Sequence, residues 1–244
     1  MSSMRAWWRE ITGLVLPVAC GGCGSPRTPL CEDCGRALYG TWPCRVRPVP
    51  EPAGLPSVYA AAPYEDAVRA VLLAHKERGA LGLAGPLGRA LAGAVRVAAP
   101  PGTGVGPLLL VPVPSARRAV GARGHDAARR IALAAAGELR RTGRSCRVLP
   151  VLRQRRAVAD QAGLGARQRL ANLSGALEVA VGGARLLEGG RVVLVDDLMT
   201  TGASLVEAAR ALRAATWAGQ QPGGVPVSAA VVAAPPLSFE INRN

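Results

Sequence analysis

The stretch Val192-Val-Leu-Val-Asp196-Asp197-Leu-Met-Thr200-Thr201-Gly202-Ala203-Ser204 joins an apolar run to two adjacent carboxylates and a loop of threonine, glycine and serine. The apolar run predicts a buried strand, and the residues that follow predict a helix. Open α/β sheets bind ligands at the carboxyl ends of their strands. The loop backbone and the helix start therefore predict a phosphate cradle, which Gly202 lets the ligand approach closely.

The two aspartates predict what the phosphate is attached to. Carboxylates repel phosphate, but Asp196 and Asp197 can accept hydrogen bonds from sugar hydroxyls, directly or through Mg²⁺. The pattern therefore predicts a 5-phosphorylated ribose with a free 2,3-diol. The residues expected to hold it are Asp196, Asp197, Thr200, Thr201, Gly202, Ala203 and Ser204.

Strand and helix patterns alternate along the rest of the chain, which predicts an α/β fold with a mostly parallel sheet and flanking helices. Apolar runs predict strands at 58–62, 108–112, 147–152, 191–195 and 225–233. Apolar residues at helical spacing predict helices at 65–78, 81–98 and 119–141. The helix after residue 204 is expected to bury Leu205, Ala208, Ala209 and Leu212.

Prolines and loop-forming residues predict the domain organisation. Five prolines between residues 43 and 57 predict a linker. We expect an N-terminal cysteine module over 1–52, a main domain over 53–234 and a tail over 235–244. Inside the main domain, residues 214–224 predict a surface loop, and the arginine-rich residues 153–172 predict a mobile segment.

The N-terminal module carries two Cys-x-x-Cys pairs, Cys20–Cys23 and Cys31–Cys34. Four thiolates at this spacing can bind one Zn²⁺ tetrahedrally, and four sulfur ligands predict a structural site. A disulfide framework and a redox pair are the alternatives. A redox pair would open a helix after a strand, and the sequence predicts neither element here.

The remaining cysteines and tryptophans are expected to have structural roles. Cys44 lacks a partner for a third pair and is expected to be a buried or vestigial thiol, and Cys146 a small core residue. Trp7, Trp8 and Trp42 are expected to pack around the zinc module, because so small a unit needs apolar anchors as well as metal.

Charge and hydropathy limit the class of protein. The chain has 244 residues and a net charge of +14, and the fourteen arginines and three acids of residues 117–169 leave +11 there. Such a segment attracts polyanions, either nucleic acid or phosphorylated small molecules. No run predicts a membrane span. Residues 5–19 resemble a signal peptide only weakly, since Glu10, Gly13 and Pro17 interrupt them, so we expect a cytoplasmic location.

Residues 192–204 resemble the 5-phosphoribosyl-1-pyrophosphate (PRPP) motif of type I phosphoribosyltransferases. With the Cys-x-x-Cys pairs upstream, the chain is similar to the ComF/GntX branch, the competence protein ComF family, over about residues 20–233. Further matches are Ala74-His-Lys76-Glu-Arg-Gly79, Val111-Pro-Val-Pro-Ser115, Arg123-Gly124, Gln161, Arg169 and Asn172. The chain departs from the family at Cys44, at His125 and in the loop near Gly219.

The resemblance implies Mg²⁺-dependent transfer of a 5-phosphoribosyl group to an acceptor that the sequence does not identify, with release of pyrophosphate. It implies that Val113, Pro114, Ser115 and Arg117 form the pyrophosphate loop, with a strained or cis peptide bond. It places the arginine-rich segment where a mobile loop closes over the site, so Arg153, Arg155 and Arg156 are the catalytic candidates. It also implies that two chains pair.

Two alternatives accompany this assignment. The family is associated with natural transformation, so the chain could instead bind single-stranded DNA or the DNA-uptake machinery, although residues 117–169 contain no aromatic residue for stacking on bases. It could also sense PRPP without transferring it. We expect His75 and His125 to be polar surface groups and Lys76 to be solvated.

Overall fold

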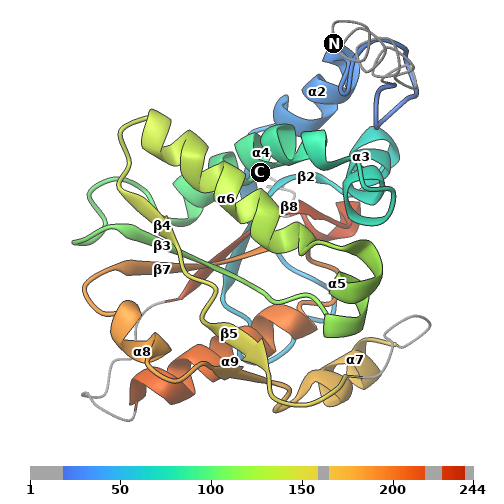
Figure 1. The fold of residues 1–244 in the computed structure, drawn as a ribbon. Helices are drawn as coiled ribbons and strands as arrows, with labels where there is room; N and C mark the ends of the chain where they lie inside the picture. The colour runs from blue at the N-terminus through green and yellow to red at the C-terminus, as the bar shows by residue number, and fades with distance from the viewer. Residues whose placement is uncertain (1–18, 159–164, 218–226, 240–244) are drawn as a thin grey trace, which may run out of the picture.

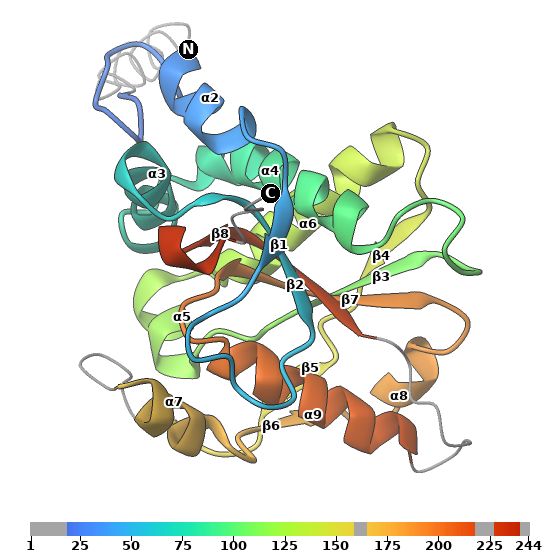
Figure 2. The ribbon, with the colours of Figure 1, turned by 180° about the vertical axis from the view of Figure 1, so that it is seen from behind.

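The computed structural model describes residues 19–158, 165–217 and 227–239 and contains a six-stranded sheet (Figures 1 and 2). β1 is antiparallel to β2, and every other pair of neighbours in this sheet is parallel. In spatial order the strands are β1 (Cys44–Val46), β2 (Ser57–Pro63), β8 (Ser228–Ala234), β7 (Arg191–Leu198), β3 (Leu108–Pro112) and β4 (Cys146–Val148). The predicted α/β fold is confirmed.

Helices cover both faces of this sheet (Figure 1). One face packs against α2 (Glu32–Tyr39), α3 (Asp66–Glu77), α4 (Ala84–Ala98) and α6 (Ala127–Arg141). The other face packs against α9 (Ala203–Trp217) and the small sheet of β5 (Leu152–Gln154) and β6 (Leu177–Val179). The shorter elements are η1 (Leu81–Leu83), α5 (Arg117–Arg123), α7 (Ala166–Leu173), α8 (Gly183–Leu186) and η2 (Pro236–Ser238).

The central strands are apolar throughout because both of their faces are buried. Val193 and Val195 of β7 belong to the core beneath α3, α4 and α6, whereas Val192 and Leu194 belong to the core beneath α9. This alternation follows from the two-residue period of a strand. An unbroken apolar run bounded by polar residues is therefore the expected sequence of such a strand.

The chain reverses its winding direction between β3 and β7. The two strands are hydrogen-bonded neighbours, with Pro112 paired to Val195. The chain leaves β3 toward α6 on one face of the sheet, and it leaves β7 toward α9 on the other. The carboxyl ends of β3 and β7 are therefore the point of the sheet at which open α/β folds bind ligands.

The prediction of one continuous helix over 119–141 is wrong, because the segment forms two helices. α5 ends at Gly124, whose φ of +72° is a left-handed conformation that glycine adopts without strain. α6 then begins after Asp126, whose carboxylate accepts a hydrogen bond from the Arg129 backbone N–H. Gly124 and the Asp126 cap were the local signals for two helices.

The predicted strand over 147–152 divides into two strands in different sheets. β4 pairs with β3, whereas β5 pairs with β6. Pro150 lies between them, and because proline has no backbone N–H it cannot continue a ladder.

Other expected loops are more ordered than the sequence predicted. Residues 44–46 of the expected linker form β1, and α9 runs through Trp217 into the expected loop. The expected tail contains η2, and Phe239 forms a β-bridge with Val46. Trp42 is 84% exposed, so its predicted packing around the cysteines is wrong. Trp7, Trp8, Gln161 and Gly219 lie outside the described residues.

Within the described ranges, no helix is both long enough and apolar enough to cross a membrane.

Close packing of α4 on α6 gives a test of the fold. A Cβ at Gly88 would lie 2.4 Å from the Ala134 Cβ and 2.7 Å from the Ala135 backbone nitrogen. Gly88→Ala should therefore destabilise the protein by about 1–3 kcal/mol in urea unfolding, because neither neighbour can move easily. The matched control Gly137→Ala in α6 meets no atom within 4 Å and should stabilise it by about 0.5–1 kcal/mol. Equal effects would contradict this packing.

Candidate ligand site at the carboxyl ends of β3 and β7

The two predicted carboxylates lie at the end of β7, on opposite faces of the strand. Asp197 is buried and points to the same side as Val195, whereas Asp196 is half-buried and points to the other side. The Asp197 backbone N–H donates a hydrogen bond of 2.8 Å to Asp196 Oδ1. Burial and the adjacent Asp197 charge raise the pKa of Asp196 well above its ordinary value.

Lys76 holds the buried carboxylate. Its Nζ lies 2.7 Å from Asp197 Oδ2, and the side chains are 33% and 7% exposed. Burial would lower the pKa of Lys76, but the charges of Asp197 and Asp196 outweigh burial and raise it. The prediction of a solvated Lys76 is therefore wrong. The available signal was composition, because Lys76 is the only lysine beside 29 arginines.

The loop after β7 needs glycine at position 202 because of its backbone conformation and its contact with Leu55. Gly202 adopts a φ of +76°, and a Cβ there would lie 2.8 Å from Leu55 Cδ1, so no larger residue fits. α9 begins at the next residue, Ala203, and the Val206 N–H donates to the Gly202 carbonyl. Thr201 and Ser204 are half-buried, and Thr200 is exposed.

Arg169 of α7 reaches this loop from a distant part of the chain. Its Nη1 lies 3.4 Å from Thr200 Oγ1. Its Nε is buried without a hydrogen-bond partner among the described residues. Burying an N–H donor without a partner costs free energy, so an acceptor beside Thr200 would be favourable for this guanidinium.

The turn after β3 lies beside the end of β7. The Val113 N–H donates to the Val195 carbonyl at 2.9 Å, and the Ser115 hydroxyl donates to Asp126 at 3.3 Å. A pocket of about 280 Å³ opens there, lined by Pro114, Ser115, Arg117, Val120, Asp126, Leu152, Arg153 and Gln154. The expected strained or cis peptide bond is absent from described residues 113–117.

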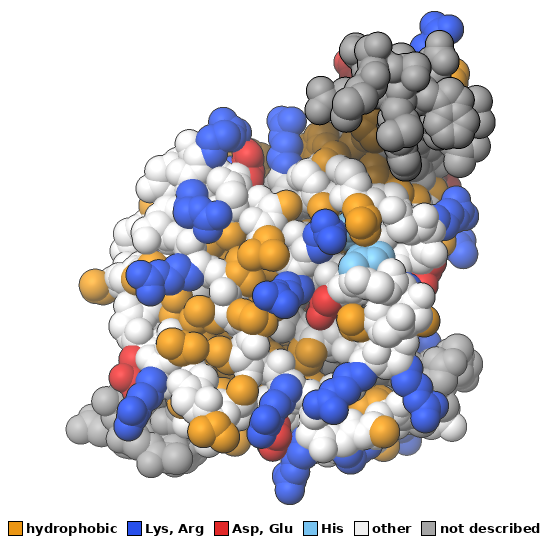
Figure 3. Space-filling view, viewed as in Figure 1, with side chains coloured by type: hydrophobic (Ala, Val, Ile, Leu, Met, Phe, Trp, Pro, Cys, Tyr) orange, Lys and Arg blue, Asp and Glu red, His pale blue; other side chains and the backbone are white. Residues whose placement is uncertain are grey.

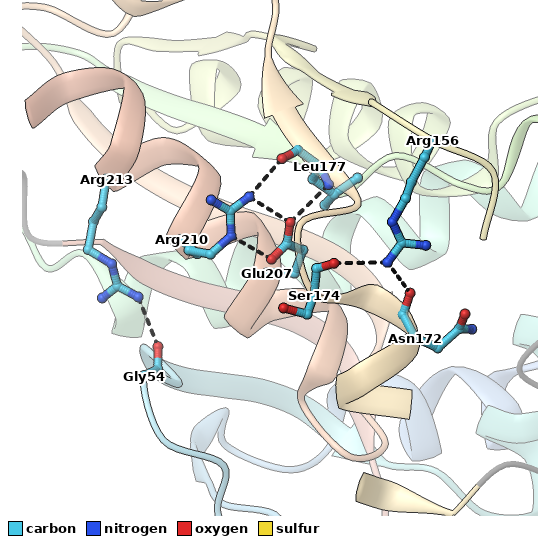
Figure 4. Close-up of polar contacts among 8 residues, drawn as sticks. All are labelled: Gly54, Arg156, Asn172, Ser174, Leu177, Glu207, Arg210 and Arg213. Atoms are coloured by element: carbon cyan, nitrogen blue, oxygen red, sulfur yellow. Dashed lines mark hydrogen bonds and ion pairs between the residues drawn. The ribbon is translucent and has the colours of Figure 1, made fainter. Parts of the chain in front are cut away.

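The three arginines predicted to act in catalysis have contacts within their own segment. Arg153 pairs with Glu178 across β5 and β6 at 2.9 Å, and it also lines the pocket. The Arg155 backbone N–H donates to the Ala176 carbonyl. Arg156 donates to the carbonyls of Asn172 and Ser174, both at 2.8 Å, at the end of α7 (Figure 4). The structure thus brings only Arg153 to the pocket, and residues 159–164 lie outside its described part.

An ion pair on α9 holds the β5–β6 sheet, and no local sequence signal predicted it (Figure 4). Glu207 is 3% exposed, accepts from Arg210 Nε at 2.7 Å and accepts from the Leu177 N–H at 2.9 Å. Arg210 also donates to the Leu177 carbonyl at 2.9 Å. Burial opposes ionisation of Glu207, but these donors outweigh it and lower its pKa.

The two histidines differ from their predicted surface role. His75 is fully buried on α3 and His125 is half-buried, with ring centroids 5.7 Å apart. His125 Nε2 lies 3.2 Å from the His75 carbonyl. Burial lowers the pKa of His75, so its environment favours the neutral ring.

The four N-terminal cysteines converge as predicted. The sulfur atoms of Cys20, Cys23, Cys31 and Cys34 all lie within 4.8 Å of one another. Tetrahedral zinc with Zn–S bonds of about 2.3 Å requires sulfur atoms about 3.8 Å apart, so the cluster could hold a metal such as zinc. Burial raises the pKa of Cys20, but nearby backbone N–H groups outweigh burial and lower it to about 6. The lowered pKa favours the thiolate of Cys20, whereas burial and the neighbouring sulfur atoms raise the pKa of Cys34.

The six cysteines, all of them described, form no disulfide bond. Cys146 is buried as predicted, and Cys44 is half-buried. The expectation that no helix adjoins the cysteine pairs is wrong, because α2 begins directly after Cys31. An isolated bridge joins Ala19 to Pro26 around the first pair, outside any named strand.

Comparison with known proteins gives no assignment: no protein-family model matches this chain, and no match was found among curated proteins.

Metal binding can be tested with variants in which one cysteine is replaced. The wild type should contain about one equivalent of zinc per chain, and Cys34→Ser should lose it, because a closed four-sulfur site needs every ligand. The loss should lower the melting temperature by roughly 5–10 °C. Cys44→Ser is the control and should keep the metal, since Cys44 lies outside the cluster. Equal metal content in both variants would exclude this ligand set.

The raised pKa of Asp196 predicts a pH-dependent cost in stability. An acid whose pKa is raised by folding stabilises the native state in acid and loses that contribution as pH rises from its ordinary pKa toward the raised one. Asp196→Asn should therefore raise the melting temperature at pH 7 by about 2–4 °C, with the gain shrinking toward pH 4.

Thermal unfolding across a pH series measures this effect. The control is Glu188→Gln, which changes an exposed carboxylate and should alter the melting temperature little. If Asp196→Asn melts below the wild type at pH 7, or if its gain in melting temperature grows in acid, the pKa of Asp196 is not raised by folding.

Proposed function

We propose that the protein binds PRPP with Mg²⁺ and transfers its 5-phosphoribosyl group to an acceptor, releasing pyrophosphate. The observation that carries this proposal is the position of Asp196 and Asp197 at the carboxyl end of β7, beside β3 and next to a glycine loop that begins a fifteen-residue helix. The carboxylates would accept hydrogen bonds from the ribose hydroxyls. The N–H groups of the loop and of the first turn of α9 would bind the 5-phosphate.

The contact between Lys76 and Asp197 affects where magnesium would bind. Asp197 already contacts an ammonium at 2.7 Å, so an uncharged sugar hydroxyl suits its remaining oxygen better than a second cation does. Magnesium would therefore arrive with the pyrophosphate, where it supplies charge neutralisation to the leaving group. Arg117 and Arg153 line the adjacent pocket and would stabilise the same charge.

In the reaction that we propose, the bond from C1 of the ribose to pyrophosphate breaks and a bond from C1 to the acceptor forms. The electron pair of the broken bond leaves with pyrophosphate, and the acceptor loses a proton to solvent or to its own base. The protein's part is to hold the sugar by its phosphate and diol, and to stabilise the departing charge. Arg169, with its unpartnered Nε, would contribute a further donor beside the 5-phosphate.

The wider assignment to the ComF/GntX branch is part of this proposal. A four-cysteine cluster preceding a mostly parallel α/β sheet is compatible with that branch. We accordingly propose zinc as the structural metal of the cluster. The pairing of two chains and a role in DNA uptake stay predictions of the resemblance, and the cytoplasmic location stays a prediction from the N-terminal sequence.

Direct binding of nucleic acid is supported less well than PRPP binding. The Lys and Arg side chains are spread over the face seen in Figure 3, with apolar side chains between them, and do not gather in a single patch. On this face, such a distribution gives general attraction for polyanions without a continuous basic patch. A regulator that binds PRPP without transfer would use the same residues, and pyrophosphate release with candidate acceptors separates it from an enzyme.

Titration calorimetry with PRPP and Mg²⁺ tests the proposal. The wild type should bind with a Kd between about 1 µM and 1 mM, the range common for enzyme substrates. Asp197→Asn should weaken binding by about tenfold or more, because it removes a charged acceptor from the diol and frees Lys76. Glu188→Gln should bind as the wild type does. No heat from the wild type, or unchanged affinity of Asp197→Asn, would refute the assignment.

A further inference from the structure

Helix α3 lies between the cysteine cluster and the candidate ligand site. Its first contact is with the backbone of the first cysteine pair. A Cβ at Gly21 would lie 3.4 Å from the Ala74 Cβ, and a Cβ at Gly22 would lie 3.4 Å from Val71 Cγ2. The loop that joins Cys20 to Cys23 therefore rests directly on α3, and glycine permits this approach.

The second contact of α3 is with the carboxylate at the end of β7. Lys76 lies two residues after Ala74, and two residues of an α-helix turn through about 200°. The side chain of Lys76 thus leaves α3 on the side away from the cysteine loop and reaches Asp197 at 2.7 Å. The helix thus places one face against the cysteine loop and directs Lys76 toward Asp197. Figure 1 shows α2 and α3 as neighbours.

Few residues in the described part of the N-terminal module are buried apart from its cysteines. Between residues 19 and 40, the buried residues are Cys20, Cys34, Gly35 and Leu38. Two of these four are cluster cysteines, so a bound metal would provide much of the order of this segment. A Cβ at Gly22 would also lie 2.5 Å from Cys34 Sγ, so the loop that contacts α3 packs against a ligand atom itself.

We propose that metal in the four-cysteine cluster controls the affinity of the Asp196–Asp197 site for its phosphorylated sugar, through α3 and the Lys76–Asp197 pair. The inference rests on the function proposed above. With metal bound, the Gly21–Gly22 loop fixes α3, and Lys76 keeps the Asp197 carboxylate oriented for the diol. Without metal, α3 loses that support and Lys76 positions Asp197 less often. Lys76 is accordingly a positioning residue.

Thermodynamic linkage gives the proposal two readouts of the same coupling. If metal strengthens sugar-phosphate binding, then the sugar phosphate must strengthen metal binding by the same factor. The first readout is the affinity for PRPP with Mg²⁺, measured on zinc-loaded protein and on protein from which zinc was chelated and the chelator then removed. The second is the rate at which a chromogenic chelator takes zinc from the folded protein, with and without PRPP.

Zinc removal should weaken PRPP binding by the wild type about tenfold. Lys76→Met should weaken binding about tenfold even with zinc, and removing zinc should then change it less than twofold, because the connection is already lost. Arg78→Met, which removes an exposed cation at the same end of α3, is the matched control and should keep the full effect of zinc. Lys76→Arg should restore part of the coupling.

The zinc-release measurement decides the question if the zinc-free chain unfolds, which circular dichroism would reveal. PRPP should slow zinc release from the wild type and from Arg78→Met several-fold, and should leave release from Lys76→Met unchanged. Binding of PRPP with equal affinity and equal zinc release in all states would overturn this inference and leave the proposed function intact. Absence of PRPP binding by the zinc-loaded wild type would overturn both.

Discussion

Two negative charges at the end of a strand buried on both faces are the constraint on which the site depends. Such charges must be solvated, paired or protonated. Lys76 pairs with Asp197 at 2.7 Å, and burial beside the Asp197 charge raises the pKa of Asp196. The arrangement lowers stability, as polar groups at binding sites commonly do. The location of these two carboxyl groups at the end of β7, beside β3, is the physical reason to connect them with a ligand.

The central strands and the acid pair could be predicted from sequence because their signals are local. The runs at 108–112 and 191–195 are apolar throughout, and two carboxylates followed by a glycine loop define the end of a strand. The same holds for the cysteine pairs. Local signals were also present where prediction failed, since Gly124 ends α5 and Pro150 separates β4 from β5.

Pairings between residues far apart in the chain leave no comparable local signal in the sequence. Nothing near Lys76 in the sequence indicates that its partner is Asp197, and nothing near Leu177 indicates that Glu207 and Arg210 hold its backbone. Arg169 likewise meets Thr200 only because α7 folds over the start of α9. The strand ends could therefore be predicted as a candidate site. The cations beside it could not, because 29 arginines make any one of them unremarkable in the sequence.

A crystal structure with PRPP and Mg²⁺ would test the central claim most directly. Our account predicts the 5-phosphate against the backbone from Thr200 to Ser204, with the ribose hydroxyls about 2.6–3.2 Å from the carboxylates of Asp196 and Asp197. It also predicts pyrophosphate beside the turn at Ser115 and Arg117. A sugar phosphate bound elsewhere, with Asp197 still in contact with Lys76 alone, would contradict the account.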